Sequence, residues 1–72
     1  MRELEILSVV ALLKDSVDQS VRRGQVGTVV EQLAPGVYEV EFVDSAGQTY
    51  AMLPLRGDQL LQLHHEPVHQ AA

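Results

Sequence analysis

The sequence predicts an all-β protein, a small barrel of five short strands with one short helical turn before the last strand. Two observations carry this prediction. Apolar and polar residues alternate in runs at Val26 to Leu33, Val37 to Val43 and Gln48 to Leu53. The connections between these runs, residues 34–36 and 44–47, each end in a glycine, which is typical of a hairpin with a three-residue loop.

The remaining strands are placed at the two ends of the chain. The apolar run within residues 4–13 fits either a helix or a buried strand, and we favour a strand at Val9 to Leu13 with a short turn before it. The polar residues that follow form a loop to the second strand. We expect Pro54 to end the fourth strand, the segment RGDQL to form the helical turn, and Leu60 to Leu63 to form the closing strand.

The length and composition allow one domain. A chain of 72 residues holds a single thin core, so we assign residues 1–66 to one barrel and residues 67–72 to a flexible C-terminal tail. The longest apolar run is far shorter than the roughly 20 residues of a membrane helix. No basic export signal precedes that run, and the chain has no cysteine. We therefore expect a cytoplasmic protein without disulfides or thiolate metal sites.

The hairpin loops set an expected register. A loop at residues 45–47 places Phe42 opposite Tyr50, and the same rule in the first hairpin places Val30 opposite Val40. This register keeps one face of the sheet apolar. The expected core face comprises Thr28, Val30, Tyr38, Val40, Phe42, Tyr50 and Met52.

The same register gathers carboxylates on the opposite face. It places Glu31 directly across from Glu39, with Glu41 on the same side, although like charges opposed across strands repel each other. Apolar residues surround them, and charge around an apolar group is typical of a protein interface. Bending of the sheet could equally cover these residues within one chain. The candidate partner-binding residues are Glu31, Glu39, Glu41, Val29, Leu33, Arg22 and Arg23.

Arg22 and Arg23 are the only adjacent cations in a chain of net charge −5. Two arginines supply too few phosphate contacts for useful affinity at physiological salt, so we do not expect nucleic-acid binding. One alternative is that these arginines neutralise the glutamates within the chain. The other is that the glutamates are neutralised by a basic partner outside it. The thin core and the apolar outer residues also predict a homo-oligomer, most simply a dimer.

Four motifs occur in order at regular spacing between Val9 and Leu63: VVALL, GQVGTVV, YEVEF and DSAGQTY. In this layout the chain resembles a bacterial family of small stand-alone domains of unknown function. The resemblance implies an SH3-like barrel. The glycine-rich entrance, with Gly24, Gly27 and Val29, is also similar to the KOW motif of ribosomal and transcription proteins, although this chain is acidic and has few basic residues.

No catalytic or metal-binding pattern is present in the sequence. We expect no enzyme activity, since the chain lacks a nucleophile motif and a small barrel has no room for a substrate. We expect no cofactor and no metal, because Pro67 interrupts a helix between His65 and His69, and three histidines, with His64, on a loose tail lack a rigid second shell. Gly24 and Gly27 could approach a phosphate, but a bend into the second strand explains them better.

The sequence therefore predicts a protein-interaction module that binds a protein partner and regulates or neutralises it, as antitoxins and immunity proteins do. The alternative is a KOW-like module that associates with RNA or the ribosome.

Overall fold

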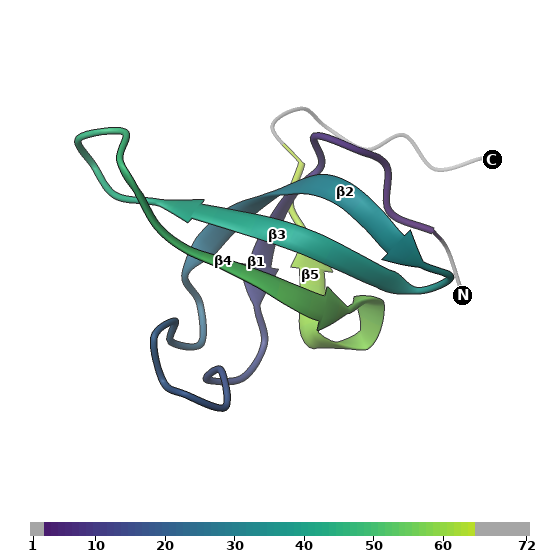
Figure 1. Ribbon diagram of the computed structural model, residues 1–72, viewed down its shortest axis with the longest axis horizontal. Helices are drawn as coiled ribbons and strands as arrows, with labels where there is room; N and C mark the ends of the chain where they lie inside the picture. The colour runs from purple at the N-terminus through teal and green to yellow at the C-terminus, as the bar shows by residue number, and fades with distance from the viewer. Residues whose placement is uncertain (1–2, 65–72) are drawn as a thin grey trace, which may run out of the picture.

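The computed structural model describes residues 3–64. Its five strands form one antiparallel sheet in the order β4-β3-β2-β1-β5 (Figure 1). A single 3-10 turn, η1 (Gly57–Gln59), precedes the last strand. The strands are β1 (Val9–Leu12), β2 (Val26–Ala34), β3 (Val37–Val43), β4 (Thr49–Arg56) and β5 (Leu60–Gln62). The predicted all-β architecture and the helical turn before the last strand are confirmed.

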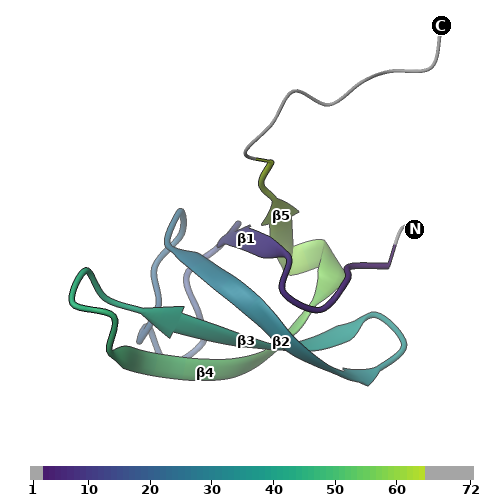
Figure 2. The ribbon, with the colours of Figure 1, turned by 90° about the horizontal axis from the view of Figure 1, so that it is seen from above.

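Strand β2 connects the two sides of the sheet. Its first residues pair with β1, and most of its length pairs with β3. Figure 2 shows β2 running from the side of β1 and β5 to the side of β3 and β4. The turn η1 then carries the chain from one edge strand, β4, to the other, β5. The closer comparison with SH3-like barrels stays a prediction.

The core is built around the central strand β3. Tyr38, Val40 and Phe42 alternate inward from this strand and are almost completely buried. The hydroxyl oxygen of Tyr38 accepts a hydrogen bond from the backbone N–H of Leu4 at 3.0 Å, so its polar end is satisfied. The other buried apolar residues are Val10, Leu12, Val21, Val29, Leu55 and Leu60.

A β-bulge in β2 changes the predicted register of the first hairpin. Val29 pairs with Val40 and Glu31 pairs with Glu39, so Val30 is an extra residue between them. Val29 is therefore fully buried, and Val30 is only half-buried. The prediction that Val30 faces Val40 in the core was wrong, because the bulge moves every earlier residue of β2 by one position.

A second irregularity changes the register of the other hairpin. Val43 pairs with Thr49 but Phe42 pairs with Ala51, so Tyr50 is the extra residue. Tyr50 is 40% exposed and Met52 is 49% exposed, which contradicts their predicted place in the core. Thr28 is only half-buried and pairs with Glu41 on the outer face, so it was also misplaced. Ala51 and Leu53 pack against the core instead.

Pro54 does not end the fourth strand, as was predicted from its lack of an N–H group. The N–H of Gly57 donates to the carbonyl of Gly36 at 2.9 Å, and alternation along the ladder makes Glu39 and Pro54 a non-hydrogen-bonded pair. The missing N–H of Pro54 therefore faces outward, where an edge strand tolerates proline. Strand β4 continues to Arg56.

The two hairpin glycines adopt the predicted left-handed conformation, with φ of 73° at Gly36 and 82° at Gly47. In the second turn, Asp44 faces Gln48 as predicted, and its N–H donates to the Gln48 carbonyl at 2.8 Å. The first loop is one residue shorter than predicted, because Ala34 pairs directly with Val37.

Gly24 and Gly27 have different roles. Gly24 has φ of 88° in the turn before β2, which fits the predicted bend. Gly27 lies inside β2 opposite Phe42, and a Cβ there would lie 2.8 Å from Val40 Cγ1 and 2.9 Å from Phe42 Cδ2. The glycine therefore lets β2 approach the core side chains of β3.

We expect Phe42→Ala to lower the free energy of unfolding by about 3–5 kcal/mol, because it empties a fully buried site in a small core. Denaturant unfolding followed by circular dichroism measures the change. Val43→Ala, at a 47% exposed neighbour, is the control and should change stability by less than about 0.5 kcal/mol. Equal effects of the two variants would contradict this core.

We expect Gly27→Ala to lower the free energy of unfolding by about 1–3 kcal/mol, because the added methyl group overlaps two packed side chains and a backbone carbonyl of β3. Thermal unfolding measures this change. A variant that unfolds at the wild-type temperature would show that β2 and β3 are further apart than described.

Candidate functional site

The outer face of β2, β3 and β4 presents three glutamates, and we call it the glutamate face. Glu31 lies directly opposite Glu39, as the sequence predicted, and Glu41 lies two residues further along β3. Glu31 is exposed, whereas Glu39 and Glu41 are half-buried. The register places Met52 and Pro54 of β4 beside these two residues. The face therefore combines three carboxylates with apolar neighbours.

Glu39 has the most confined carboxylate of the three. It lies on the central strand, between Glu31 on one side and the ring of Pro54 on the other. Pairs without backbone hydrogen bonds bring their side chains close together, so the proline crowds the glutamate. Its Oε1 atom is buried and has no hydrogen-bond partner within residues 3–64. By contrast, Oε2 of Glu41 accepts a hydrogen bond from the Thr49 hydroxyl at 2.6 Å.

Two cations of the described region, Arg22 and Arg56, are paired with aspartates away from this face. The Arg22 guanidinium lies 3.6 Å from the Asp15 carboxylate, which also accepts a hydrogen bond from the backbone N–H of Arg23. Arg56 pairs with Asp58 at 3.1 Å. Within residues 3–64, no salt bridge reaches a glutamate of the face. The structure therefore does not bring Arg22 and Arg23 together with Glu31, Glu39 and Glu41.

The two apolar candidates, Val29 and Leu33, also have different positions in the structure. Val29 is fully buried because the bulge in β2 turns it into the core, so its predicted place beside the glutamates was wrong. Leu33 is 45% exposed near the end of β2, where a second register shift follows Gln32. The apolar part of the face is supplied by Met52 and Pro54, which the sequence reasoning had assigned to the core and to a strand end.

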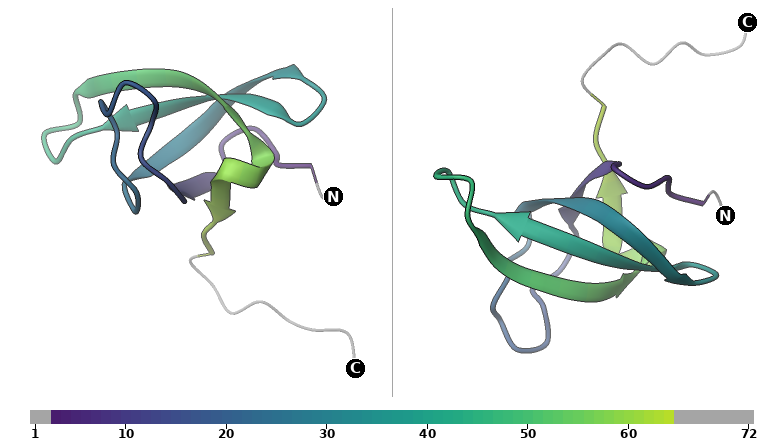
Figure 3. Two further views of the ribbon diagram at one scale, coloured as in Figure 1. Left: turned by 90° about the horizontal axis from the view of Figure 1, so that it is seen from below. Right: turned by 45° about the horizontal axis from the view of Figure 1, so that its top comes forward.

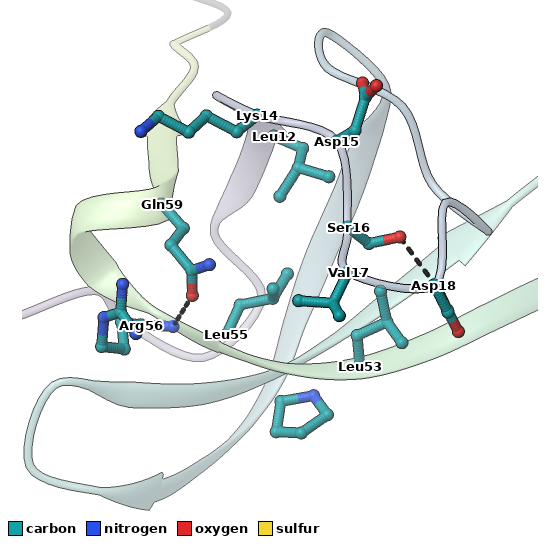
Figure 4. Close-up of a pocket in the computed structure, with 11 residues that line it drawn as sticks. Leu12, Lys14, Asp15, Ser16, Val17, Asp18, Leu53, Leu55, Arg56 and Gln59 are labelled. Carbon is teal, nitrogen blue, oxygen red and sulfur yellow. Dashed lines mark hydrogen bonds between the residues drawn. The ribbon is translucent and has the colours of Figure 1, made fainter.

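A groove that sequence reasoning missed lies between the β1–β2 loop and the edge strand β4 (Figure 4). It has a volume of about 390 Å³ and is lined by residues 14–18 of the loop, residues 53–56 of β4, and Leu12 and Gln59. Figure 3 shows the loop running alongside β4. The groove depends on an ordered loop. In the sequence, the segment SVDQS indicates this order, since Ser and Asp at this spacing favour tight turns.

Asp18 and Val21 hold this loop in place. Oδ1 of Asp18 accepts hydrogen bonds from the Ser20 N–H at 2.9 Å, the Ser20 hydroxyl at 2.7 Å and the Ser16 hydroxyl at 2.9 Å. These bonds, first those from Ser20 and then that from Ser16, lower the pKa of Asp18 below its ordinary value. Val21, the residue after Ser20, is fully buried, and its side chain lies in the core.

The histidine segment gives no site in the described region. His64 is exposed at the end of that region, and His65 and His69 lie outside it, as does the predicted tail at residues 67–72. Among residues 3–64, no three His, Asp or Glu side chains are arranged to hold a metal ion. None of the helices in this region is long and apolar enough to cross a membrane.

The fold and these surfaces define a small all-β domain with an acidic sheet face and a separate groove. The family described as "Domain of unknown function (DUF4926)" matches residues 6–62, and the chain belongs to this family. The predicted membership of a family of unknown function is confirmed. Among curated proteins and solved structures, no significant match was found.

We expect Asp18→Asn to loosen the loop, because an uncharged side chain binds the donors of Ser16 and Ser20 less strongly. The lowered pKa means that the loop is held by the charged form, which is fully present above the ordinary aspartate pKa and is lost as the pH falls through the lowered value. The amide shift of Ser20, followed by NMR on acidification, should report this transition.

Asp58→Asn is the control for this experiment, since Asp58 pairs with Arg56 outside the loop. It should leave the transition at Ser20 unchanged, whereas Asp18→Asn should abolish it. An unchanged transition in Asp18→Asn would contradict the assignment.

Proposed function

We propose that this chain is a cytoplasmic protein-interaction module that binds a basic segment of a protein partner through the glutamate face. One observation carries the proposal. Glu31 and Glu39 are directly opposed, and no residue of the described region donates a hydrogen bond to the buried Oε1 of Glu39. Opposed carboxylates destabilise the isolated sheet by a few tenths of a kcal/mol, and a buried unpaired oxygen adds to this cost. A cation from outside would relieve both effects.

The chemistry of the face favours arginine or lysine side chains as ligands. An arginine donates to two carboxylate oxygens at once, so one side chain can satisfy neighbouring glutamates. Met52 and Pro54 provide apolar surface for the stem of the same side chain. The net charge of −5 attracts a basic partner over a longer range and speeds its association.

A protein partner fits the charges better than RNA does. Two of the cations in residues 3–64, Arg22 and Arg56, are paired with aspartates, which reduces the charge available to phosphates. Binding that masks a basic surface of the partner would regulate or neutralise it, as antitoxin-like and immunity-like proteins do. This biological role is an analogy from size and charge. It does not follow from the fold.

We expect the double variant Glu31→Gln, Glu39→Gln to be as stable as the wild type or more stable by a few tenths of a kcal/mol, because the repulsion is removed. Its binding to the protein partner should be weaker and less sensitive to salt. The partner is recovered by pull-down from the native host with nuclease treatment. Melting temperature and isothermal titration at two salt concentrations then measure both effects.

Glu5→Gln is the control, because Glu5 is exposed before β1 and away from the glutamate face. It should bind the partner as the wild type does. A double variant that is clearly less stable but binds normally would overturn the proposal. Recovery that is lost on nuclease treatment would support the RNA alternative.

A further inference from the structure

The groove beside β4 is lined by cations as well as acids, unlike the glutamate face. Figure 4 shows Lys14 and Arg56 on one side, Asp15 and Asp18 on the other, and apolar side chains between them. A second hollow of about 270 Å³ shares Lys14, Arg56 and Gln59 with the groove. Lys14 and Arg56 therefore border both hollows.

The acids of the groove are already used by the loop. Asp15 accepts the Arg23 N–H at 2.8 Å and faces the Arg22 guanidinium, and Asp18 accepts three hydrogen bonds through one oxygen. Asp15 is therefore paired with a cation, whereas Asp18 keeps its charge and is oriented by the loop. Each of these two carboxylates already has partners within the loop.

The cations keep unused donors. The Lys14 ammonium makes no hydrogen bond or salt bridge within residues 3–64, and Arg56 uses its Nε for Asp58, which leaves its terminal nitrogens without partners in the same region. The chain has twice as many acids as bases, yet two cations with unused donors lie at this one groove. These donors determine the charge of a ligand that pairs with them. The ligand should carry a negative charge.

The floor of the groove selects for aliphatic groups. Leu12 and Leu55 are buried beneath it, and Leu53 packs partly against the core. Val17 is fully exposed at its rim, with a relative accessibility of 103%. A volume of about 390 Å³ lies within the range of small-ligand sites and accommodates an aliphatic side chain with its flanking backbone.

The edge of β4 argues against simple addition of another strand. Pro54 has no N–H to offer, and the N–H of Arg56 already donates to Oε1 of Gln59 at 2.8 Å. Two successive outward positions of the edge therefore lack a free donor. A bound segment must be recognised mainly by its side chains.

We infer that this groove binds an extended segment of a protein partner that presents an aliphatic side chain next to an aspartate or glutamate. The aliphatic group would lie over Leu12, Leu55 and Val17, and the carboxylate would pair with Lys14 and Arg56. This surface is separate from the glutamate face and takes a ligand of opposite charge, so the inference does not depend on the function proposed above.

The test is an NMR titration of the ¹⁵N-labelled full chain with the acetylated, amidated peptide Leu-Glu-Leu-Glu. The amides of residues 12–18, Leu53 and residues 55–59 should shift, and the matched peptide Leu-Gln-Leu-Gln should bind more weakly. Lys14→Gln should reduce affinity for the glutamate peptide by about fivefold, the upper range for an exposed ion pair. It should leave the affinity for the glutamine peptide unchanged.

Arg23→Gln is the matched control, because it removes the same charge from an exposed residue that does not line the groove. It should affect the glutamate peptide less than Lys14→Gln does. The inference is overturned if low-millimolar peptide shifts no groove amide or if both peptides bind equally. It is also overturned if Lys14→Gln and Arg23→Gln weaken binding of the glutamate peptide alike. A shift of the groove amides by oligouridylate at a lower concentration than the peptide would overturn it too.

Discussion

The extra residue Val30 in β2 is the constraint on which the rest of the structure depends. Because the bulge absorbs one residue, Val29 faces Val40 in the core while Glu31 faces Glu39 on the outside. Without it, β2 would present either a buried glutamate or an exposed valine along part of its length. Gly27 completes the arrangement, since its missing side chain lets β2 pack closely on Val40 and Phe42.

The second irregularity, at Tyr50, has the same effect on the other side of β3. It turns Ala51 and Leu53 toward the core and leaves Met52 beside Glu41 on the outer face. The central strand alternates strictly, whereas β2 shifts register after Val29 and again after Gln32, and β4 shifts once. The glutamate face results from the shifts at Val30 and Tyr50, which gather three carboxylates and two apolar side chains on one surface.

The strands, the helical turn, both left-handed glycines and the pairing of Glu31 with Glu39 could be predicted from the sequence, because alternation and turn residues are local signals. The bulges could not. Val29 and Val30 are the same residue type, so hydrophobicity cannot show which of them faces inward. The groove was also missed, because it needs Asp15 to meet Arg22 and Arg23 across the loop and Leu53 to lie beneath it. Pro54 was misread because an edge position depends on strand order.

The glutamate face and the groove beside β4 are built from different residues of this small chain. The glutamate face depends on the inward placement of Val29 and the bulge that causes it. A NOESY experiment on the methyl-labelled chain tests this placement directly. The account predicts contacts between the Val29 methyl groups and Val40, with Val30 outside the core. Contacts of Val30 with Val40, together with solvent-exposed Val29 methyl groups, would contradict it.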